Sequence, residues 1–343
     1  MTSSEIDYET SLKLENPLYV DVRTEKEYNH SHIIGSVNIP VFTDEERAIV
    51  GTIYDQGLIL KAKSLGVTYG AAKLPEIFEF IAASQKKQPV VLYCSRGGYR
   101  SGSLYHFFQG IGIFVFKLKS GYKGYRNYII NSTDALSNKL SFVNLTGYTG
   151  SGKTKIIEKL KTHGCQTLNL EELANHRGSL LGAVGLSQQP SQKMFESLIE
   201  YELRKFDSKR PVFIEDESSK IGSLYVPAAL YKAYAHSDSK VFVAADMDLR
   251  IKNILTEYLA GDKAENLAEL ESAIDEIQRY IGKAPAEKLK AALKNEQYIQ
   301  AAKYLMENYY DKNYSIKSDD IKMKLENSDP EKSAKAIIKL FGK

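Results

Sequence analysis

A cysteine followed by arginines and glycines is the first feature of this sequence that could do chemistry. Cys94 opens the segment Cys94-Ser95-Arg96-Gly97-Gly98-Tyr99-Arg100-Ser101. The apolar run before it, 89–93, predicts a buried strand that ends at the cysteine, and a helix is expected to start near Arg100. Backbone N–H groups at such a strand–loop–helix turn form a cradle for an anion. Together with Arg96 and Arg100 the cradle favours a thiolate, so Cys94 is a candidate nucleophile at neutral pH.

The glycines of this segment, Gly97 and Gly98, are expected to let the backbone turn tightly enough to close the cradle. The alternative interpretation of Cys94 is a small apolar side chain buried at a strand end. A purely apolar cysteine does not need a cationic loop around it. The two nearby arginines therefore favour the chemical interpretation.

A second anion-binding motif matches the pattern G-x-x-x-x-G-K-[ST] and reads Gly147-Tyr148-Thr149-Gly150-Ser151-Gly152-Lys153-Thr154. An apolar run at 140–145 precedes it and a helical pattern at 153–160 follows, which is the context that this phosphate-binding loop, or P-loop, requires. The backbone N–H groups of Gly150, Ser151, Gly152, Lys153 and Thr154 are expected to wrap a phosphate or diphosphate. Lys153 adds a positive charge, and the Thr154 hydroxyl is a candidate ligand of Mg²⁺.

Three carboxylates, Glu215-Asp216-Glu217, follow the apolar run 212–214. Glu215 or Asp216 is a candidate to bind Mg²⁺ directly or through its water ligands; the alternative is a solvated acidic strand end. Arg177 is a candidate contact to a substrate phosphate, with an ordinary loop as the alternative. The histidines show no metal-ligand spacing, which predicts that no other metal is bound.

These motifs need strands and helices to position them. Strands are expected at 18–22, 36–40, 89–93 and 113–118, with helical spacing between them, for example at 74–83. Strands separated by helices imply crossover connections and a mostly parallel sheet. The polar cluster Asn131-Ser132-Thr133-Asp134 is expected to be a turn and the first domain boundary.

A second α/β unit is expected to have strands at 140–145, 167–170, 212–214 and 240–244 and helices at 153–160 and 192–206. Beyond Leu249 the spacing is helical, and no further strand is expected. The sequence thus predicts an α/β protein with a parallel-sheet domain at 1–133, a P-loop NTPase-like domain at 134–249 and a helical C-terminal region at 250–343.

The composition limits the classes of protein to which this chain can belong. The 343 residues, 43% hydrophobic and 26% charged, fit a soluble protein of at least two domains. The net charge of +3 is compatible with a nucleic-acid partner without requiring one. No apolar run approaches the roughly 18 residues of a membrane span, and residues 1–15 lack a signal-peptide pattern, so we expect a cytoplasmic protein without a membrane partner. The oligomeric state cannot be inferred from the sequence.

The first domain resembles rhodanese domains. Asp21-Val22-Arg23-Thr24-Glu25-Lys26-Glu27-Tyr28 and His32-Ile33-Ile34-Gly35-Ser36-Val37-Asn38-Ile39-Pro40 look like their N-terminal signature, and Cys94 lies where they keep a sulfur-carrying cysteine. Asp21 and His32 are then expected to be structural. The loop from Cys94 to Arg100 is one residue longer than is typical of sulfurtransferases. Its Cys-x5-Arg spacing resembles the larger cradle of rhodanese-like phosphatases, which accommodates a tetrahedral oxyanion.

A rhodanese domain followed by a P-loop domain resembles the tRNA 2-selenouridine synthase family across nearly the whole chain. The residues that carry the resemblance, besides the two loops, are 50–54, 64–66, 121–126, 176–179, 215–218 and 221–222. Position 95 departs from the family, because bacterial members have Trp after the cysteine and this chain has Ser95. The departure leaves open how a nucleobase or an apolar ligand fits beside the loop.

The resemblance implies that the substrate is 2-thiouridine at the wobble position of certain tRNAs, bound through the anticodon arm. Its sulfur would be alkylated by geranyl diphosphate, and selenium from selenophosphate would then displace the alkylthio group. The P-loop with Lys153 and Mg²⁺ would hold the diphosphate. Cys94 would receive or position selenium, with Arg96 and Arg100 holding the phosphate of selenophosphate. The helices after Leu249 are candidates for binding the anticodon arm. The alternative is that they only form a helical cap over the P-loop domain.

Two other interpretations stay open at this point. One is a rhodanese-like cysteine phosphatase or arsenate reductase fused to a P-loop module, which the Cys-x5-Arg spacing supports. The other is a non-catalytic P-loop protein whose rhodanese part is a sensing module. An unperturbed Cys94 thiol, titrating near about 8.5, would favour that second interpretation.

Overall fold

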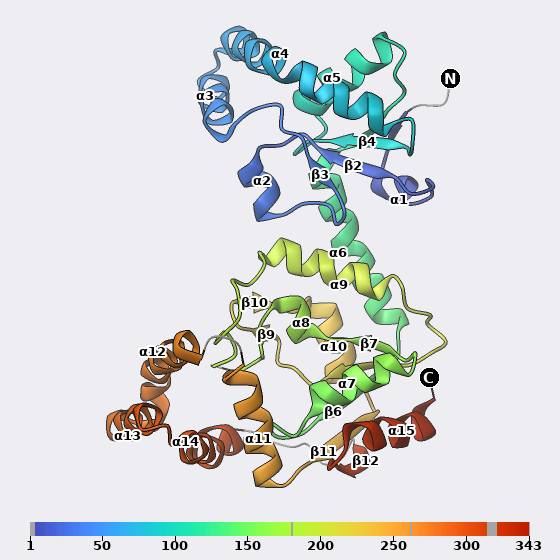
Figure 1. The fold of residues 1–343 in the computed structure, drawn as a ribbon. Coiled ribbons are helices and arrows are strands. Elements are labelled where there is room, and N and C mark those ends of the chain that lie inside the picture. Colours follow the sequence, from blue (N-terminus) through green and yellow to red (C-terminus); the bar gives the residue numbers. More distant parts are fainter. Residues whose placement is uncertain (1–3, 180, 261–262, 314–320, 343) are drawn as a thin grey trace. The chain divides into compact units, whose positions relative to one another are not determined.

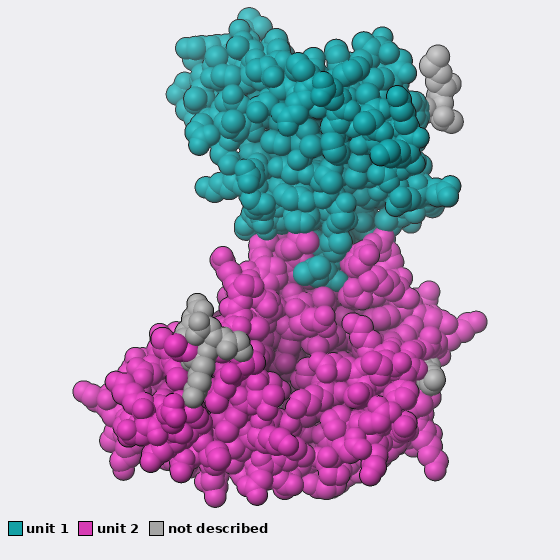
Figure 2. All heavy atoms as spheres, in the orientation of Figure 1, with its two compact units in different colours: residues 1–132, 196–198 teal, residues 133–195, 199–343 magenta. Residues whose placement is uncertain are grey.

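The structure, a computed structural model, describes residues 4–179, 181–260, 263–313 and 321–342. It divides into two compact units, which Figure 2 shows in different colours. Unit 1 contains residues 1–132 and 196–198, and unit 2 contains residues 133–195 and 199–343. The expected fold class is confirmed, because each unit is built on a parallel sheet with helices around it (Figure 1). None of the described helices is long and apolar enough to cross a membrane.

Unit 1 has a five-stranded parallel sheet in the order β1-β5-β4-β2-β3. Its strands are β1 (Glu5–Ile6), β2 (Leu18–Asp21), β3 (Val37–Asn38), β4 (Val90–Tyr93) and β5 (Phe116–Leu118). Its helices are α1 (Tyr8–Ser11), α2 (Glu25–His30), α3 (Asp44–Asp55), α4 (Ile59–Ser84) and α5 (Tyr99–Gly110), and α6 (Gly121–Lys139) begins in unit 1 and ends in unit 2.

The central strand β4 is apolar throughout because both faces of the sheet are covered. Side chains alternate along a strand. Val90 and Leu92 therefore pack with α4 and α5, whereas Val91 and Tyr93 pack with the residues of α1 and α6. A strand buried in this way fixes the position at which Cys94 emerges.

Unit 2 has a second five-stranded parallel sheet, in the order β12-β11-β6-β8-β7. Its strands are β6 (Phe142–Thr146), β7 (Gln166–Leu168), β8 (Val212–Glu215), β11 (Lys240–Ala244) and β12 (Ile321–Glu326), and β9 (Lys220–Ile221) and β10 (Leu224–Tyr225) form a separate hairpin. One face packs against α8 (Leu170–Ala174), α9 (Gln192–Leu203) and α10 (Ala228–Ala235), and the other against α7 (Lys153–Thr162) and α15 (Pro330–Phe341).

The remaining helices of unit 2 form a cluster with its own apolar core (Figure 1). They are α11 (Met247–Tyr258), α12 (Lys263–Ile281), α13 (Lys283–Lys294), α14 (Tyr298–Leu305), the π-helix η1 (Met306–Tyr310) and the short 3₁₀-helix η2 (Asp311–Asn313).

Two local expectations are wrong. Strands do not stop at Leu249, because β12 pairs in parallel with β11 at the edge of the sheet. Its sequence alternates apolar residues with Lys322, Lys324 and Glu326, which is typical of an edge strand. The polar cluster 131–134 is not a turn but part of α6, where the Ser137 hydroxyl donates a hydrogen bond to the Thr133 carbonyl oxygen at 2.7 Å.

A buried ion pair holds the end of β2. Two nitrogens of the Arg23 guanidinium donate to the Asp21 carboxylate, at 3.0 Å and 2.6 Å, and Arg23 also lies 4.2 Å from the centre of the Tyr122 ring. Both charged side chains are almost fully buried. Removing one partner would leave the other charge buried without compensation.

We therefore expect Asp21→Ala to lower the free energy of unfolding by about 3–5 kcal/mol in urea denaturation. The control is Lys303→Ala, which breaks the exposed i,i+4 pair with Glu307 and should cost no more than about 0.5 kcal/mol. Equal effects of the two substitutions would contradict a structural role for the Asp21–Arg23 pair.

Candidate functional site

The cysteine loop begins at the carboxyl end of β4 and leads into α5. Cys94 is only 3% exposed and packs at the edge of the unit 1 core. Its Sγ accepts a hydrogen bond from the Ser101 hydroxyl, with 3.1 Å between sulfur and oxygen. Ser101 lies in the first turn of α5, so the sulfur lies beside the N-terminus of that helix and accepts from a hydroxyl donor.

The carbonyl groups of this loop are held by the start of α6. The N–H groups of Tyr122 and Lys123 donate to the carbonyl oxygens of Cys94 and Ser95 at 2.8 Å and 2.9 Å. Gly121 has a φ of +55°, and a Cβ there would collide with the Cys94 carbonyl oxygen. With these carbonyls turned toward α6, N–H groups of the loop are left to face a ligand.

The two arginines of the loop have different surroundings. Arg100 is paired with Glu27 of α2, at 2.5 Å and 3.2 Å between nitrogens and oxygens, and also donates to the Ser95 hydroxyl. Burial opposes ionisation of Glu27, but the hydrogen bonds and charge of Arg100 outweigh it and lower the pKa of that carboxyl to about 2. Arg96 is exposed, and within the described part of the chain it has no ion pair. Arg96 is thus the guanidinium of this loop that can reach an anion without displacing a carboxylate.

The P-loop follows β6 and leads into α7. Five successive carbonyl oxygens of the loop accept hydrogen bonds from side chains. Lys153 Nζ donates to the first two, those of Gly147 and Tyr148, at 2.8 Å and 3.3 Å. The other three are held from outside the loop. N–H groups between them are free to turn toward a phosphate, as the sequence motif requires.

The three outside donors are residues that the sequence did not reveal. Arg250 Nε donates to Thr149 at 2.9 Å, Asn253 Nδ2 to Gly150 at 2.8 Å and Asn327 Nδ2 to Ser151 at 2.7 Å. Arg250 is fixed in turn by a two-nitrogen contact with Asp311, and the Asn327 amide oxygen accepts a hydrogen bond from Ser333.

These donors also explain the glycines of the loop. A Cβ on Gly150 would come 2.7 Å from the Arg250 carbonyl oxygen, and one on Gly152 would come 2.7 Å from Asn327 Nδ2. Both glycines have a positive φ, which disfavours any residue with a side chain. Single asparagines and arginines so far along the sequence carry no motif, and only the fold brings them to the P-loop.

Glu215 lies at the end of β8, next to the P-loop, and its carboxyl accepts a hydrogen bond from Thr154. It is 4% exposed, and its Oε1 has no hydrogen-bond partner among the described residues. The residues present fit Mg²⁺, which usually takes one or two carboxylates together with phosphate oxygens. No group of three or more acidic, His or Cys side chains is arranged for a metal in the described ranges. Asp216 instead accepts a hydrogen bond from Asn144 at 3.2 Å.

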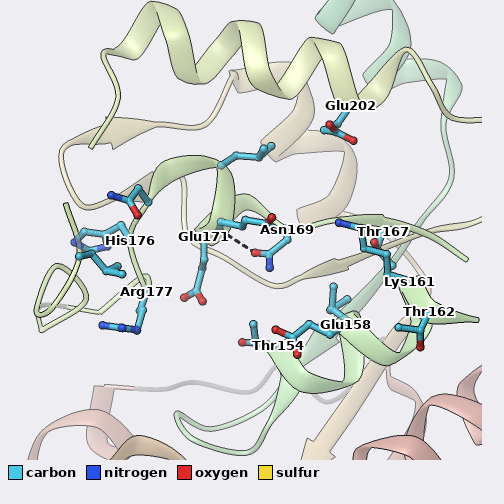
Figure 3. Close-up of a pocket in the computed structure, with 15 residues that line it drawn as sticks. Thr154, Glu158, Lys161, Thr162, Thr167, Asn169, Glu171, His176, Arg177 and Glu202 are labelled. Atoms are coloured by element: carbon cyan, nitrogen blue, oxygen red, sulfur yellow. Dashed lines mark hydrogen bonds between the residues drawn. The ribbon is translucent and has the colours of Figure 1, made fainter. Parts of the chain in front are cut away.

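Three further glutamates, from separate segments, surround Lys153. Burial first, and then the charges of Glu215 and Glu217, raise the pKa of Glu171 to about 9. Burial and Glu215 likewise raise the pKa of Glu217 to about 7, and burial raises that of Glu257. Figure 3 shows Glu171 pointing from α8 toward Thr154, with Arg177 on its other side.

Arg177 does not stand free in the cleft. Its guanidinium donates to the carbonyl oxygens of Val184 and Glu257, at 2.6 Å and 3.3 Å, and lies 5.1 Å from the centre of the Tyr258 ring. It therefore joins the loop 176–179 to the end of α11 while still lining the cleft.

The P-loop, Arg177 and the glutamates around Lys153 line one cleft of about 1130 Å³ in unit 2. Its walls come from the P-loop, the loop 176–179, the end of β8, and helices α11, α12 and η1. A neighbouring cleft of about 610 Å³, drawn in Figure 3, shares Thr154, Glu171, His176 and Arg177 with it. The larger cleft exceeds what a phosphate group alone would fill, so its ligand has a further part.

Two known families match the chain. The rhodanese-like domain matches residues 7–128, and the tRNA 2-selenouridine synthase AAA domain matches residues 140–340. A tRNA 2-selenouridine synthase of Nitrosomonas eutropha is 34% identical over 71% of this chain and 63% of that protein. Those of Nitrosomonas europaea and Shewanella oneidensis are 33% and 34% identical over 74% and 70% of this chain, covering 66% and 63% of their own lengths. The chain thus spans just under two thirds of these relatives.

The raised pKa values of the glutamates predict how stability depends on pH. Folded Glu171 and Glu217 keep protons that the unfolded chain, with carboxyl groups near 4.5, has already lost. Unfolding then releases protons, so stability should fall as pH rises from about 4.5 to about 9, most steeply below pH 7, where both groups contribute. Below pH 7, Glu217→Gln should reduce the slope of the free energy of unfolding against pH, measured in urea, by the equivalent of up to about one proton. The exposed Glu172→Gln is the control, and an unchanged slope in Glu217→Gln would contradict the buried cluster.

The bracing of the P-loop predicts a loss of anion affinity in Asn327→Ala. Without the amide, the Ser151 carbonyl is free to rotate toward the ligand, and binding of inorganic diphosphate should weaken about five- to ten-fold in calorimetry. Asn38→Ala is the matched control, because the Asn38 amide, like that of Asn327, donates to backbone carbonyl oxygen, but Asn38 lies in unit 1. Should both variants bind diphosphate as tightly as the unaltered protein, the amide does not shape the loop.

Proposed function

The chain belongs to the tRNA 2-selenouridine synthase family, as its sequence resemblance predicted, and we propose that it replaces the sulfur of 2-thiouridine in tRNA by selenium. The observation that carries the proposal is the presence of two anion-binding loops in one chain, one behind a cysteine and one around Lys153. The tRNA would bind through its anticodon arm, with the wobble base as the reacting group.

The P-loop would bind the diphosphate of geranyl diphosphate. The thiocarbonyl sulfur of the base attacks the first carbon of the geranyl group, and the electron pair of the broken C–O bond leaves with the diphosphate. The base then loses its N3 proton to water. Lys153 and the N–H groups of the loop stabilise the charge that grows on the leaving diphosphate. Mg²⁺, held by Thr154 and Glu215, would add positive charge against the phosphate oxygens.

The cysteine loop would release selenium from selenophosphate. Selenium has the same oxidation level in selenophosphate and in the product, so the step needs no redox partner. The Cys94 thiolate attacks phosphorus, the P–Se bond breaks, and selenide leaves with the electron pair; water later cleaves the S–P bond to give phosphate and the free thiol. Arg96 holds the phosphate oxygens, whereas Arg100, tied to Glu27, positions the loop.

Selenide then completes the exchange at the base. It adds to C2 and displaces the geranylthiolate, which takes a proton from water. Alkylation makes this possible because an alkylated sulfur is a far better leaving group than a thiocarbonyl sulfur.

The proposal predicts separable defects. With thiolated tRNA, geranyl diphosphate and selenophosphate, Cys94→Ala should still form the geranylated nucleoside but no selenouridine, whereas Lys153→Ala should slow geranylation about 100-fold or more. Mass spectrometry of the wobble nucleosides, with each co-substrate omitted in turn, measures both. Cys165→Ala, at the chain's other cysteine, is the control and should keep both steps. Loss of both activities in Cys94→Ala would contradict the division of labour.

A further inference from the structure

Four tyrosines line the same cleft as the P-loop. They are Tyr258 of α11, Tyr280 of α12, and Tyr309 and Tyr310 of the π-helix η1. The ring centres of Tyr280 and Tyr309 are 5.7 Å apart, and those of Tyr309 and Tyr310 are 5.1 Å apart. A π-helix is rare in proteins and is often found at functional sites. The rings of Tyr280, Tyr309 and Tyr310 are thus in contact, and the four tyrosines together are here called the tyrosine wall.

The wall is fixed at one end and open at the other. The Tyr258 hydroxyl is 3.1 Å from that of Ser179, and Tyr310 also hydrogen-bonds to Ser179. Tyr258 is only 6% exposed, whereas Tyr280 is 58% exposed although it lines a cleft. A large aromatic side chain left open inside a cleft is typical of a binding surface.

One face of α12 continues the wall. The lining residues of this helix recur at helical spacing, namely Glu269, Ser272, Ala273, Glu276, Arg279 and Tyr280. Ser272 and Ala273 are small, and they leave space beside the rings. When the phosphates of a ligand lie on the P-loop, the rest of the ligand can therefore lie in the same cleft, next to the tyrosine rings.

The charges beside the wall are of both signs. Glu269, Glu276 and Arg279 of α12 line the cleft, and the Arg279 guanidinium lies 4.9 Å from the centre of the Tyr280 ring. Neither sign of charge repels an uncharged hydrocarbon chain, whose natural contact is the surface of the rings. The faces of tyrosine rings also attract positive charge, and such charge develops on the carbon that parts from a diphosphate.

We propose that the tyrosine wall, with Ala273, binds the hydrocarbon chain of the diphosphate ester whose phosphates lie on the P-loop. The inference rests on the proposed geranyl transfer and identifies where the organic part of the donor lies. In that transfer the C–O bond breaks with its electron pair going to the diphosphate, the C–S bond forms to the base, and the wall faces the carbon that passes between them.

The test compares geranyl diphosphate, inorganic diphosphate and ATP by calorimetry on the full chain. Tyr280→Ala should weaken geranyl diphosphate about ten-fold and leave inorganic diphosphate unchanged. Tyr225→Ala is the matched control, because Tyr225 is 59% exposed, has a lysine over its ring as Tyr280 has an arginine, and does not line the cleft. Ala273→Leu, which fills the space without removing a ring, should also weaken only geranyl diphosphate.

Each of the other possible results would contradict a particular part of the proposal. An unaltered protein that binds geranyl diphosphate no more tightly than inorganic diphosphate would overturn the geranyl donor itself, and the wall with it. A preference for geranyl diphosphate that survives both Tyr280→Ala and Ala273→Leu would overturn the wall alone. Equal losses for both ligands would show that the wall only supports the fold. ATP binding that is tighter than that of geranyl diphosphate and is lost in Tyr280→Ala would assign the wall to a nucleobase.

Discussion

A loop can present its N–H groups to an anion only if its carbonyl groups are held away, because each peptide unit carries both. A carbonyl oxygen that turns toward a phosphate repels it, and an unpaired buried carbonyl is itself costly. Both anion loops of this protein meet this constraint, because groups outside each loop donate hydrogen bonds to its carbonyl oxygens. The remaining features of each site, including its glycines and the segments that pack against it, follow from those donors.

The two units supply the donors in different ways. In unit 1 the donors are backbone N–H groups at the start of α6, the next helix after the one that follows the cysteine loop. In unit 2 they are side chains of Arg250, Asn253 and Asn327, all from the C-terminal part of the chain. Asn327 follows β12 directly, and α15 beyond it packs against α7. The C-terminal part is therefore joined to the P-loop sheet by a strand, a helix and a hydrogen bond to the loop itself.

The sequence predicted the elements that continuous apolar runs specify, and it missed contacts between distant segments. β4 and β6 are strands whose residues are all buried, and each leads into a recognisable loop, so both loops could be located. β12 was missed because every second residue is charged, namely Lys322, Lys324 and Glu326. Such a short alternating segment is typical of an edge strand and lacks the continuous apolar run of a central strand. Glu27 appeared in the sequence only within the rhodanese-like signature 21–28, and its pairing with Arg100 depends on the fold, which places α2 beside the cysteine loop.

The electrostatics of the cleft explain how several carboxyl groups can face a loop that binds phosphate. Two like charges about 4 Å apart repel by about 4 kcal/mol at the effective dielectric constant near a protein surface, so ionised glutamates would exclude a diphosphate. Burial raises the pKa of Glu171 to about 9, so that this side chain keeps its proton at neutral pH, and that of Glu217 to about 7. A protonated carboxyl can donate a hydrogen bond to a phosphate oxygen. The burial that makes these acids hard to ionise therefore converts groups that would repel the ligand into groups that can bind it.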